Sequence, residues 1–307
     1  MFTRRKQLVL LGLLLTVMTL WACGTDRDDE RPLVVTTTTY VGDLVRQIGG
    51  PYIEVITLIG PGIDPHDYQP RQSDTKWLLD ADLVVINGLN LEERFGEVLR
   101  NLDSRSLLVL GDHVKTEQLL FEAPNVPDPH IWFDPAIWMA LAPVVRDALI
   151  AIDPANQAAY TARTLQYQRD IEVFVHYAMQ QVETVPSSRR ILVTAHDAFA
   201  YFGRAFGFEV YAVQGISTSG EASIVDIENL ARLLAELDIP ALFVETTVPE
   251  ATIQAVVEAA AALNHTVVVG GTLYSDSAGV IASGTDTYLR AYRHNITTII
   301  QALQSHD

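Results

Sequence analysis

The sequence predicts an α/β protein with two lobes, each a mostly parallel sheet flanked by helices, joined by one long α-helix. Short β-branched runs alternate with amphipathic helical stretches from Pro32 onward, which is typical of parallel sheets covered by helices. The same alternation restarts near Ile191, after one uninterrupted helical stretch. A chain of 307 residues is long enough for two domains of ordinary size.

The overall composition narrows the functional classes. Apolar residues make up 49% of the chain and charged residues 19%, which excludes a disordered chain and allows substantial cores. The formal net charge is −17, whereas a nucleic-acid-binding protein normally has the opposite sign. We therefore expect no nucleic-acid partner. An acidic surface mainly keeps a protein soluble, although it also attracts cations.

The N-terminus predicts export and a membrane anchor. Residues 1–22 combine a basic start with an apolar core that is shorter than a transmembrane helix, which is typical of a signal peptide. Cys23, the single cysteine, follows this core directly and resembles the modified cysteine of a bacterial lipoprotein signal. We predict a lipid on Cys23 and an acidic tether over residues 23–32, which anchor the protein without spanning the membrane. The alternative is that Cys23 is only part of an ordinary signal peptide.

The N-terminal lobe is predicted over residues 33–152. Its strands are expected in short apolar runs, and its helices in the amphipathic stretches between them. The expected strands are 33–35, 53–58, 83–86 and 107–110, and the expected helices are 40–48, 74–79 and 91–99.

A linking helix is predicted over residues 153–186. Asp153 is a typical N-cap and Pro154 suits the first helical position, whereas Pro186 ends the pattern. A stretch of about 30 residues would extend about 45 Å, long enough to run along both lobes as a stiff connector. One helical stripe of apolar residues predicts the buried face: Tyr160, Tyr167, Ile171, Phe174, Ala178 and Val182.

The C-terminal lobe is predicted over residues 187–307 and repeats the strand–helix alternation. The expected strands are 191–193, 210–213, 242–244 and 267–269, and the expected helices are 196–206, 226–237, 249–263 and 285–303. Because ligands of open parallel sheets bind beyond the carboxyl ends of the strands, polar residues at those ends are the candidates for a site.

Four metal-binding side chains stand at such positions. His66 follows the strand that ends at Leu58, and His196 follows the strand that begins at Ile191. Asp276 follows the last expected strand, and His130 lies in a proline-braced loop beyond the fourth strand. If the lobes face each other, these three imidazoles and one carboxylate can converge on one divalent cation, because imidazole favours zinc and carboxylate also admits manganese.

The spacing of these residues is weak evidence by itself, since an isolated histidine more often caps a helix or bonds within a turn. Their shared placement strengthens the set, as do the Asp-Pro-His triplets that contain His66 and His130. The remaining histidines are expected to be structural or solvated: His113, His176, His265, His294 and His306.

Several motifs resemble those of the zinc/manganese solute-binding lipoproteins of bacterial metal-uptake ABC transporters, in the family's order. The resemblance spans residues 33–307 and implies two α/β lobes, one long linking helix and a metal in the cleft between the lobes. It carries the metal ligands onto His66, His130, His196 and Asp276. The motifs are GPGIDPH (60–66), DPHIWFD (128–134), TAHDAF (194–199) with Tyr201-Phe202, QGIST (214–218), FVE (243–245) and GGTLYSD (270–276).

The resemblance implies an extracytoplasmic protein, not an enzyme, that captures one divalent metal ion and delivers it to an ABC permease. We expect a monomer anchored through Cys23. Three imidazoles favour Zn²⁺, with Mn²⁺ as the close competitor because the loop before His130 lacks a histidine-rich segment. Glu245 and Asp64 are candidates for orienting the ligands. Since histidines must be neutral to bind a metal, affinity should fall as the pH drops through roughly 6.5.

Two other classes of function fit parts of the sequence. A secreted zinc hydrolase needs three protein ligands, an open fourth position and a general base. Asp197 or Glu245 could act as that base, but Asp276 would close the fourth position, and no His-Glu-x-x-His motif occurs. An adhesin-like surface protein is compatible with a lipoprotein but has no sequence feature of its own.

Overall fold

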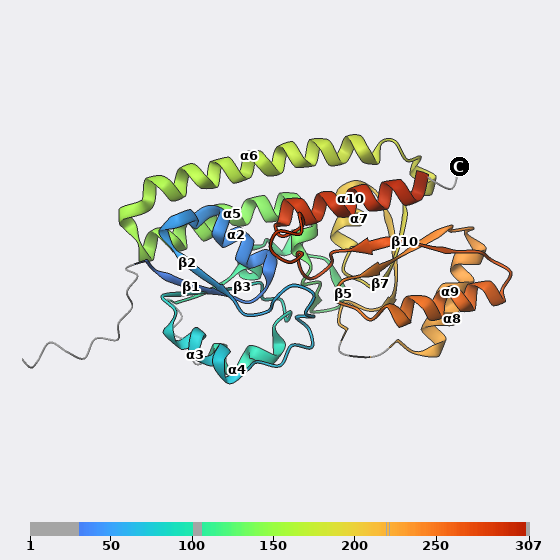
Figure 1. Cartoon of the computed structure of the whole chain (residues 1–307), viewed down its shortest axis with the longest axis horizontal. Coiled ribbons are helices and arrows are strands. Elements are labelled where there is room, and N and C mark those ends of the chain that lie inside the picture. The colour runs from blue at the N-terminus through green and yellow to red at the C-terminus, as the bar shows by residue number, and fades with distance from the viewer. Residues whose placement is uncertain (1–30, 101–105, 219, 221, 305–307) are drawn as a thin grey trace, which may run out of the picture. The chain divides into compact units, whose positions relative to one another are not determined.

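In the computed structural model, which describes residues 31–100, 106–218, 220 and 222–304, four parallel strands form the N-terminal sheet (Figure 1). They are β1 (Leu33–Thr36), β2 (Glu54–Thr57), β3 (Leu83–Ile86) and β4 (Leu107–Val109), in the order β2-β1-β3-β4. The predicted signal peptide, the lipid on Cys23 and most of the predicted tether lie outside the described residues.

Helices cover both faces of this sheet because its side chains alternate between two cores. Val34 belongs to the core on the side of α2 (Thr39–Gly49), whereas Leu33 and Val35 belong to the core on the side of α3 (Gln72–Asp80). The hydroxyl of Thr38 accepts a hydrogen bond from the backbone N–H of Val41 and caps α2. The short α4 (Gly96–Arg100) follows α3 on the same side of the sheet (Figure 1).

Helix α5 (Pro135–Ile152) was not predicted as a helix, because Asp134 and Pro135 were treated as part of a loop. The Asp134 carboxylate accepts hydrogen bonds from the first N–H groups of α5, and Pro135 occupies its first position. Within the described residues, α5 alone is long and apolar enough to cross a membrane by length and composition. Trp138 and Leu149 on α5 are fully buried, as expected of a helix in a protein core.

Helix α6 (Gln157–Val182) lies within the predicted linking helix and runs along both sheets (Figure 1). The first turn of the predicted linking helix is instead a separate 3-10 helix, η6 (Pro154–Asn156). At 1.5 Å per residue, the 26 residues of α6 extend about 39 Å. The buried stripe is the predicted one with Thr164 added: Tyr160, Thr164, Tyr167, Ile171, Phe174, Ala178 and Val182.

The C-terminal half contains two parallel strand pairs, β7–β8 and β10–β9, with β7 and β9 side by side. The strands are β7 (Ile191–His196), β8 (Glu209–Gln214), β9 (Ala241–Glu245) and β10 (Val268–Leu273). The helices are α7 (Ala200–Phe206), α8 (Ile224–Glu236), α9 (Glu250–Ala262) and α10 (Tyr288–Gln304). His196 is therefore the last residue of a strand, whereas the sequence predicted that a helix begins there.

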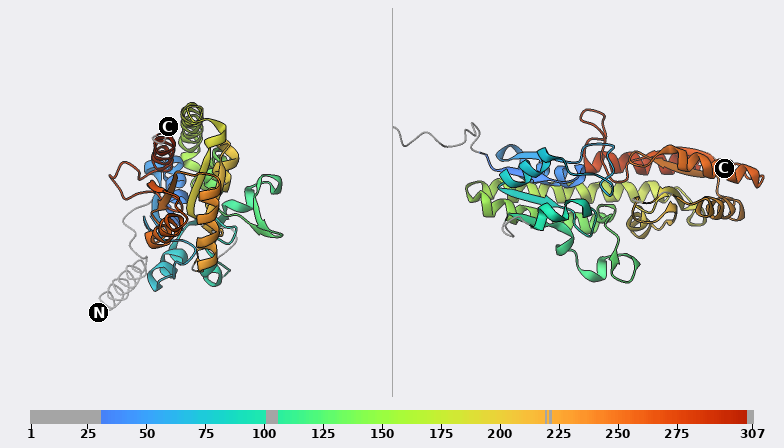
Figure 2. Two further views of the ribbon diagram at one scale, coloured as in Figure 1. Left: turned by 90° about the vertical axis from the view of Figure 1, so that its right-hand side faces the viewer. Right: turned by 90° about the horizontal axis from the view of Figure 1, so that it is seen from below.

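Short elements fill the connections. The strands β5 (Phe121–Ala123) and β6 (Val126–Pro127) form an antiparallel hairpin that was not predicted. The segment that carries this hairpin projects from the body in both views of Figure 2. The remaining 3-10 helices are η1 (Gly50–Tyr52), η2 (Glu93–Phe95), η3 (Leu110–His113), η4 (Thr116–Gln118), η5 (Ile131–Phe133) and η7 (Ser187–Arg189).

One hydrophobic core joins the two halves and fixes their strand ends toward each other. This core contains residues of β1, α2, α5, α6 and α10, together with β7 and β9. The Tyr288 hydroxyl donates to the carbonyl of Trp132 at 2.9 Å, and the Tyr292 hydroxyl donates to the carbonyl of Phe133 at 2.7 Å. The predicted α/β class with parallel sheets flanked by helices is confirmed. The lobe limits 33–152, 153–186 and 187–307 stay predictions.

Candidate metal centre

Three imidazoles and one carboxylate meet in one buried cluster between the two halves. One ligand atom from each of His66, His130, His196 and Asp276 lies within 4.8 Å of the other three. His130 and His196 have no exposed surface, Asp276 is 1% exposed, and His66 is 7% exposed. The structure thus brings together all four side chains that the sequence proposed as ligands.

Strand ends position the two predicted ligands from the C-terminal half. His196 ends β7, and Asp276 follows β10 by three residues. His66 lies in the loop after β2, and His130 immediately precedes η5. Because the two halves share a core, these strand ends and loops face each other, which is the usual place for a ligand in parallel α/β folds.

The distances within the cluster suit a shared cation. His66 Nε2 lies 3.3 Å from His130 Nε2. Asp276 Oδ1 lies 3.4 Å from His130 Nε2, and Asp276 Oδ2 lies 3.3 Å from His196 Nε2. Ligand atoms around a tetrahedral zinc with bonds of about 2.0–2.1 Å are about 3.3–3.4 Å apart. Several buried atoms here have no hydrogen-bond partner in the described chain, and they include both ring nitrogens of His196, Glu245 Oε2 and Asp276 Oδ1. Such buried, unsatisfied atoms are consistent with a metal-binding cluster.

Asp128 fixes the ring of His130. Its Oδ1 lies 2.6 Å from His130 Nδ1 and also accepts the backbone N–H of His130 at 2.9 Å. With its Nδ1 proton directed at Asp128, a neutral His130 presents the lone pair of Nε2 to the cluster. Asp128 belongs to one of the two Asp-Pro-His triplets but was not among the predicted site residues.

Asp64 holds the same place in its own triplet but makes a different contact. Its Oδ1 accepts the backbone N–H of His66 at 2.8 Å, while its other oxygen accepts a hydrogen bond from the hydroxyl of Thr218. Within the described residues, Asp64 makes no hydrogen bond or ion pair with the His66 ring. Asp64 therefore fixes the backbone of the His66 loop and ties it to the C-terminal half.

Glu245, at the end of β9, contacts His196 through both of its oxygens. Glu245 Oε2 lies 2.7 Å from His196 Nδ1. Its Oε1 accepts the backbone N–H groups of Ala195 and His196, each at 2.9 Å. One side chain therefore orients the imidazole and ties the end of β7 to β9.

Asp276 is held by groups that the sequence analysis missed. The hydroxyl of Thr247 donates to Asp276 Oδ2 at 3.2 Å and lies 2.9 Å from the hydroxyl of Ser275. Trp132 Nε1 donates to the carbonyl of Ser275 at 2.9 Å, and its ring centroid lies 5.2 Å from that of His130. Trp132 and Ser275 lie in the motifs DPHIWFD (128–134) and GGTLYSD (270–276), whereas Thr247 lies in neither.

The three imidazoles have different proton affinities. Burial lowers the pKa of His66 to about 3. Burial also disfavours the charged form of His130, but the carboxylates of Asp128 and Asp276 outweigh it and raise its pKa to about 9. For His196, Glu245 and Asp276 likewise outweigh burial and raise the pKa well above 6.5. Burial favours the neutral form of Asp276, but the neighbouring histidines lower its pKa well below 3.8.

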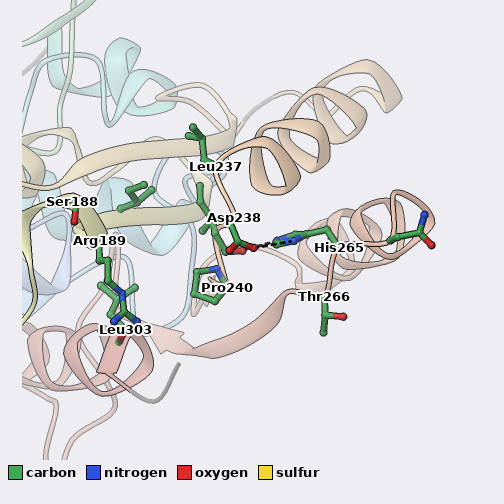
Figure 3. Close-up of a pocket in the computed structure, with 11 residues that line it drawn as sticks. Ser188, Arg189, Leu237, Asp238, Pro240, His265, Thr266 and Leu303 are labelled. Atoms are coloured by element: carbon green, nitrogen blue, oxygen red, sulfur yellow. Dashed lines mark hydrogen bonds and ion pairs between the residues drawn. The ribbon is translucent and has the colours of Figure 1, made fainter. Parts of the chain in front are cut away.

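The other described histidines lie away from this cluster. His113 and His176 are exposed, and Nε2 of His294 lies 3.0 Å from the Thr272 carbonyl. His265 lines a separate cavity of about 570 Å³ near the amino ends of the C-terminal strands, where its Nε2 lies 2.8 Å from the Ile239 carbonyl (Figure 3). His306 lies outside the described residues.

Comparison with known proteins gives consistent matches over almost the whole chain. The family described as "Zinc-uptake complex component A periplasmic" matches residues 34–302. The zinc-binding protein TroA of Treponema pallidum is 39% identical over 276 residues, which cover 90% of each chain. The manganese-binding lipoprotein MntA of Bacillus subtilis is 35% identical over 305 residues, covering 97% of this chain and 100% of that protein. The solved structure of the periplasmic zinc-binding protein TroA of T. pallidum matches with a TM-score of 0.87, covering 89% of this chain and 99% of that one.

Proposed function

We propose that this chain captures one divalent transition-metal ion and delivers it to an ABC permease. The chain belongs to the family of the periplasmic component A of zinc-uptake complexes. The observation that carries the proposal is the buried cluster of three imidazoles and one carboxylate at the facing strand ends. The relatives TroA and MntA are named as zinc-binding and manganese-binding proteins, which supports metal as the cargo.

The proposed ligands are Nε2 of His66, His130 and His196 and the carboxylate of Asp276. Their mutual distances of 3.3–3.4 Å along three contacts support this assignment, as does the lack of exposed surface at two of the imidazoles. Asp128 and Glu245 would set the tautomers of His130 and His196. Asp64 would act only on the backbone of His66.

Zn²⁺ is the proposed preferred metal, and Mn²⁺ is its competitor. Three imidazoles favour zinc over the harder manganese ion. The two oxygens of Asp276 face different histidines, so a bidentate carboxylate could also raise the coordination number, which suits manganese. The relatives include both a zinc-binding and a manganese-binding protein. A titration in which Zn²⁺ and Mn²⁺ compete for the site therefore decides which metal this chain prefers.

The proposed cellular setting is extracytoplasmic, with a lipid on Cys23 holding a monomer at the outer face of the membrane that contains the permease. The basic and apolar signal segment supports export, and relatives such as MntA are named as lipoproteins. The shared core and the continuous α6 predict that release of the metal involves local loop movement and slight tilting, without a wide hinge opening.

A zinc hydrolase is supported less well. Glu245 contacts His196 and two backbone N–H groups, so it is already engaged and poorly suited to act as a general base. Asp276 would occupy the position that a catalytic zinc keeps for water. The relatives that match are named for binding or transport of metals.

Elemental analysis of the purified chain tests the proposal. We expect about one metal ion per chain and tighter binding of Zn²⁺ than of Mn²⁺ in a competition titration. His66→Ala and His196→Ala should lose most of the metal, whereas the matched control His176→Ala, in an exposed histidine on α6, should keep it. Unchanged metal content in the two ligand variants would refute the assignment, and metal-dependent hydrolysis that survives Asp276→Ala would favour the hydrolase.

A further inference from the structure

The ligand cluster meets the solvent at one side chain. His130 and His196 are fully buried and Asp276 is nearly so, whereas His66 keeps 7% of its surface exposed. His66 also lines a cavity of about 200 Å³, and none of the other three ligands lines it. An ion that moves between solvent and cluster through this cavity would therefore contact His66 before the other ligands.

Both halves of the chain form the walls of this cavity. Asn90 and Glu93 come from the segment after β3, Glu122 and Val126 come from the β5–β6 hairpin, and Ile216 comes from the segment after β8. Apart from His66, the charged or titratable side chains in the lining are Glu93 and Glu122, and both are exposed. Neither has a cationic partner in the part of the chain that the structure describes.

Glu122 reaches from the hairpin to the opposite wall. A Cβ on Gly215 would lie only 2.4 Å from Glu122 Oε1, so this carboxylate rests against the bare backbone of Gly215, just after β8. A side chain at position 215 would displace it. The glycine therefore leaves room for a negative charge at the boundary between the two halves.

We propose that this cavity is the access route of the metal ion, with Glu93 and Glu122 as guiding residues that attract the hydrated cation toward His66. The inference rests on the proposed function. A cleft lined by one sign of charge raises the local concentration of the opposite ion and thereby its association rate. The effect weakens with salt, because the Debye length falls from about 30 Å at 0.01 M to about 3 Å at 1 M.

Stopped-flow association of Zn²⁺ with the full chain tests the guiding role, with the fluorescence of Trp132 beside His130 as the signal. We expect Glu93→Gln/Glu122→Gln to lower the association rate constant at least about threefold at low salt and to leave the dissociation rate unchanged. The difference should vanish at high salt. The matched control, Glu228→Gln/Glu236→Gln on exposed positions of α8, changes the net charge equally and should keep the wild-type rate.

A second variant tests the route itself. Val126 is 38% exposed and lines the cavity, so Val126→Trp narrows it without disturbing a buried position. Association and dissociation should both slow by the same factor, which leaves the Kd unchanged. Unaltered rates in Val126→Trp would overturn the inference, and so would a double glutamate variant whose association rate equals that of its control. Stoichiometric binding of Zn²⁺ in these experiments would still support the proposed function. A wild-type chain that binds no Zn²⁺ would refute both.

Discussion

Asp128 Oδ1 lies 2.6 Å from His130 Nδ1 in a site where both side chains are almost completely buried. Because the same oxygen also accepts the backbone N–H of His130, ring and main chain are fixed by one atom. The opposite edge of the ring, Nε2, faces both His66 and Asp276. The relationship turns an ordinary Asp-Pro-His turn into a support for His130, a proposed metal ligand.

Asp128→Asn should weaken Zn²⁺ binding about 10- to 100-fold, because the charge that orients His130 and increases its basicity is lost. Isothermal titration calorimetry measures the change. Asp64→Asn is the matched control, since Asp64 bonds the backbone of His66 and not its ring, and it should cost less affinity. Equal losses in the two variants would contradict the role assigned to Asp128.

Glu245→Gln should weaken Zn²⁺ binding at least as strongly as Asp128→Asn, because it changes which ring nitrogen of His196 carries the proton. The glutamine oxygen can still accept the N–H groups of Ala195 and His196, which leaves its NH₂ group facing His196 Nδ1. A donor at Nδ1 favours a proton on Nε2, where the metal would bind. Nitrogen NMR of the metal-free variant, at a pH where the His196 ring is neutral, should show this tautomer. The same tautomer as in the wild type, together with weakened binding, would reject the explanation.

Metal binding should release protons at pH 7.5. The pKa of His130 is raised to about 9, so this imidazole is largely protonated at pH 7.5 before the metal binds. The carboxylates of Glu245 and Asp276 raise the pKa of His196 in the same direction. Affinity should therefore rise with pH up to about 9, which lies above the value of roughly 6.5 expected for an ordinary imidazole. Calorimetry in buffers of different ionisation enthalpy counts the protons, and a count of zero at pH 7.5 would contradict this prediction.

The metal-free protein should lose stability as the pH rises. A histidine whose pKa is about 9 in the folded chain and 6.5 in the unfolded chain stabilises the fold fully below pH 6.5. That contribution of His130 disappears as the pH rises through about 9. Thermal unfolding with a chelator present should show a falling Tm over this range, and the fall should be smaller in Asp128→Asn. A Tm that rises between pH 6.5 and 9 would exclude this contribution as the dominant one.

Tyr167→Phe should destabilise the fold by about 1–3 kcal/mol without changing metal affinity. Trp138 Nε1 donates to the Tyr167 hydroxyl at 3.1 Å, and both side chains are buried between α5 and α6. Removing the hydroxyl leaves the indole N–H unsatisfied. Urea unfolding measures the loss, with Tyr177→Phe as a control because that hydroxyl is half-buried and makes only a 3.4 Å contact.

The strand positions and the long helix could be predicted because they depend on local periodicity. Runs such as Leu83–Ile86 are buried on both faces, and the stripe on α6 repeats at helical spacing. Helix α5 was missed although its cap and its proline were visible, because the apolar stretch after Pro135 was not separated from the loop before it. The β5–β6 hairpin was also missed, since its strands are very short.

The ligand candidates followed from the sequence because parallel strands bring their carboxyl ends to one edge, so chemistry-bearing residues there are predictable from strand order. Their supports were not predictable in the same way. Glu245 reaches His196 only because β9 lies beside β7, and Thr247 reaches Asp276 only because β10 pairs in parallel with β9. Strand adjacency, the shared core and the resulting proton affinities are through-space properties. Local sequence therefore determined which residues could bind a metal, and the tertiary structure decided which neighbours orient them and how strongly each holds a proton.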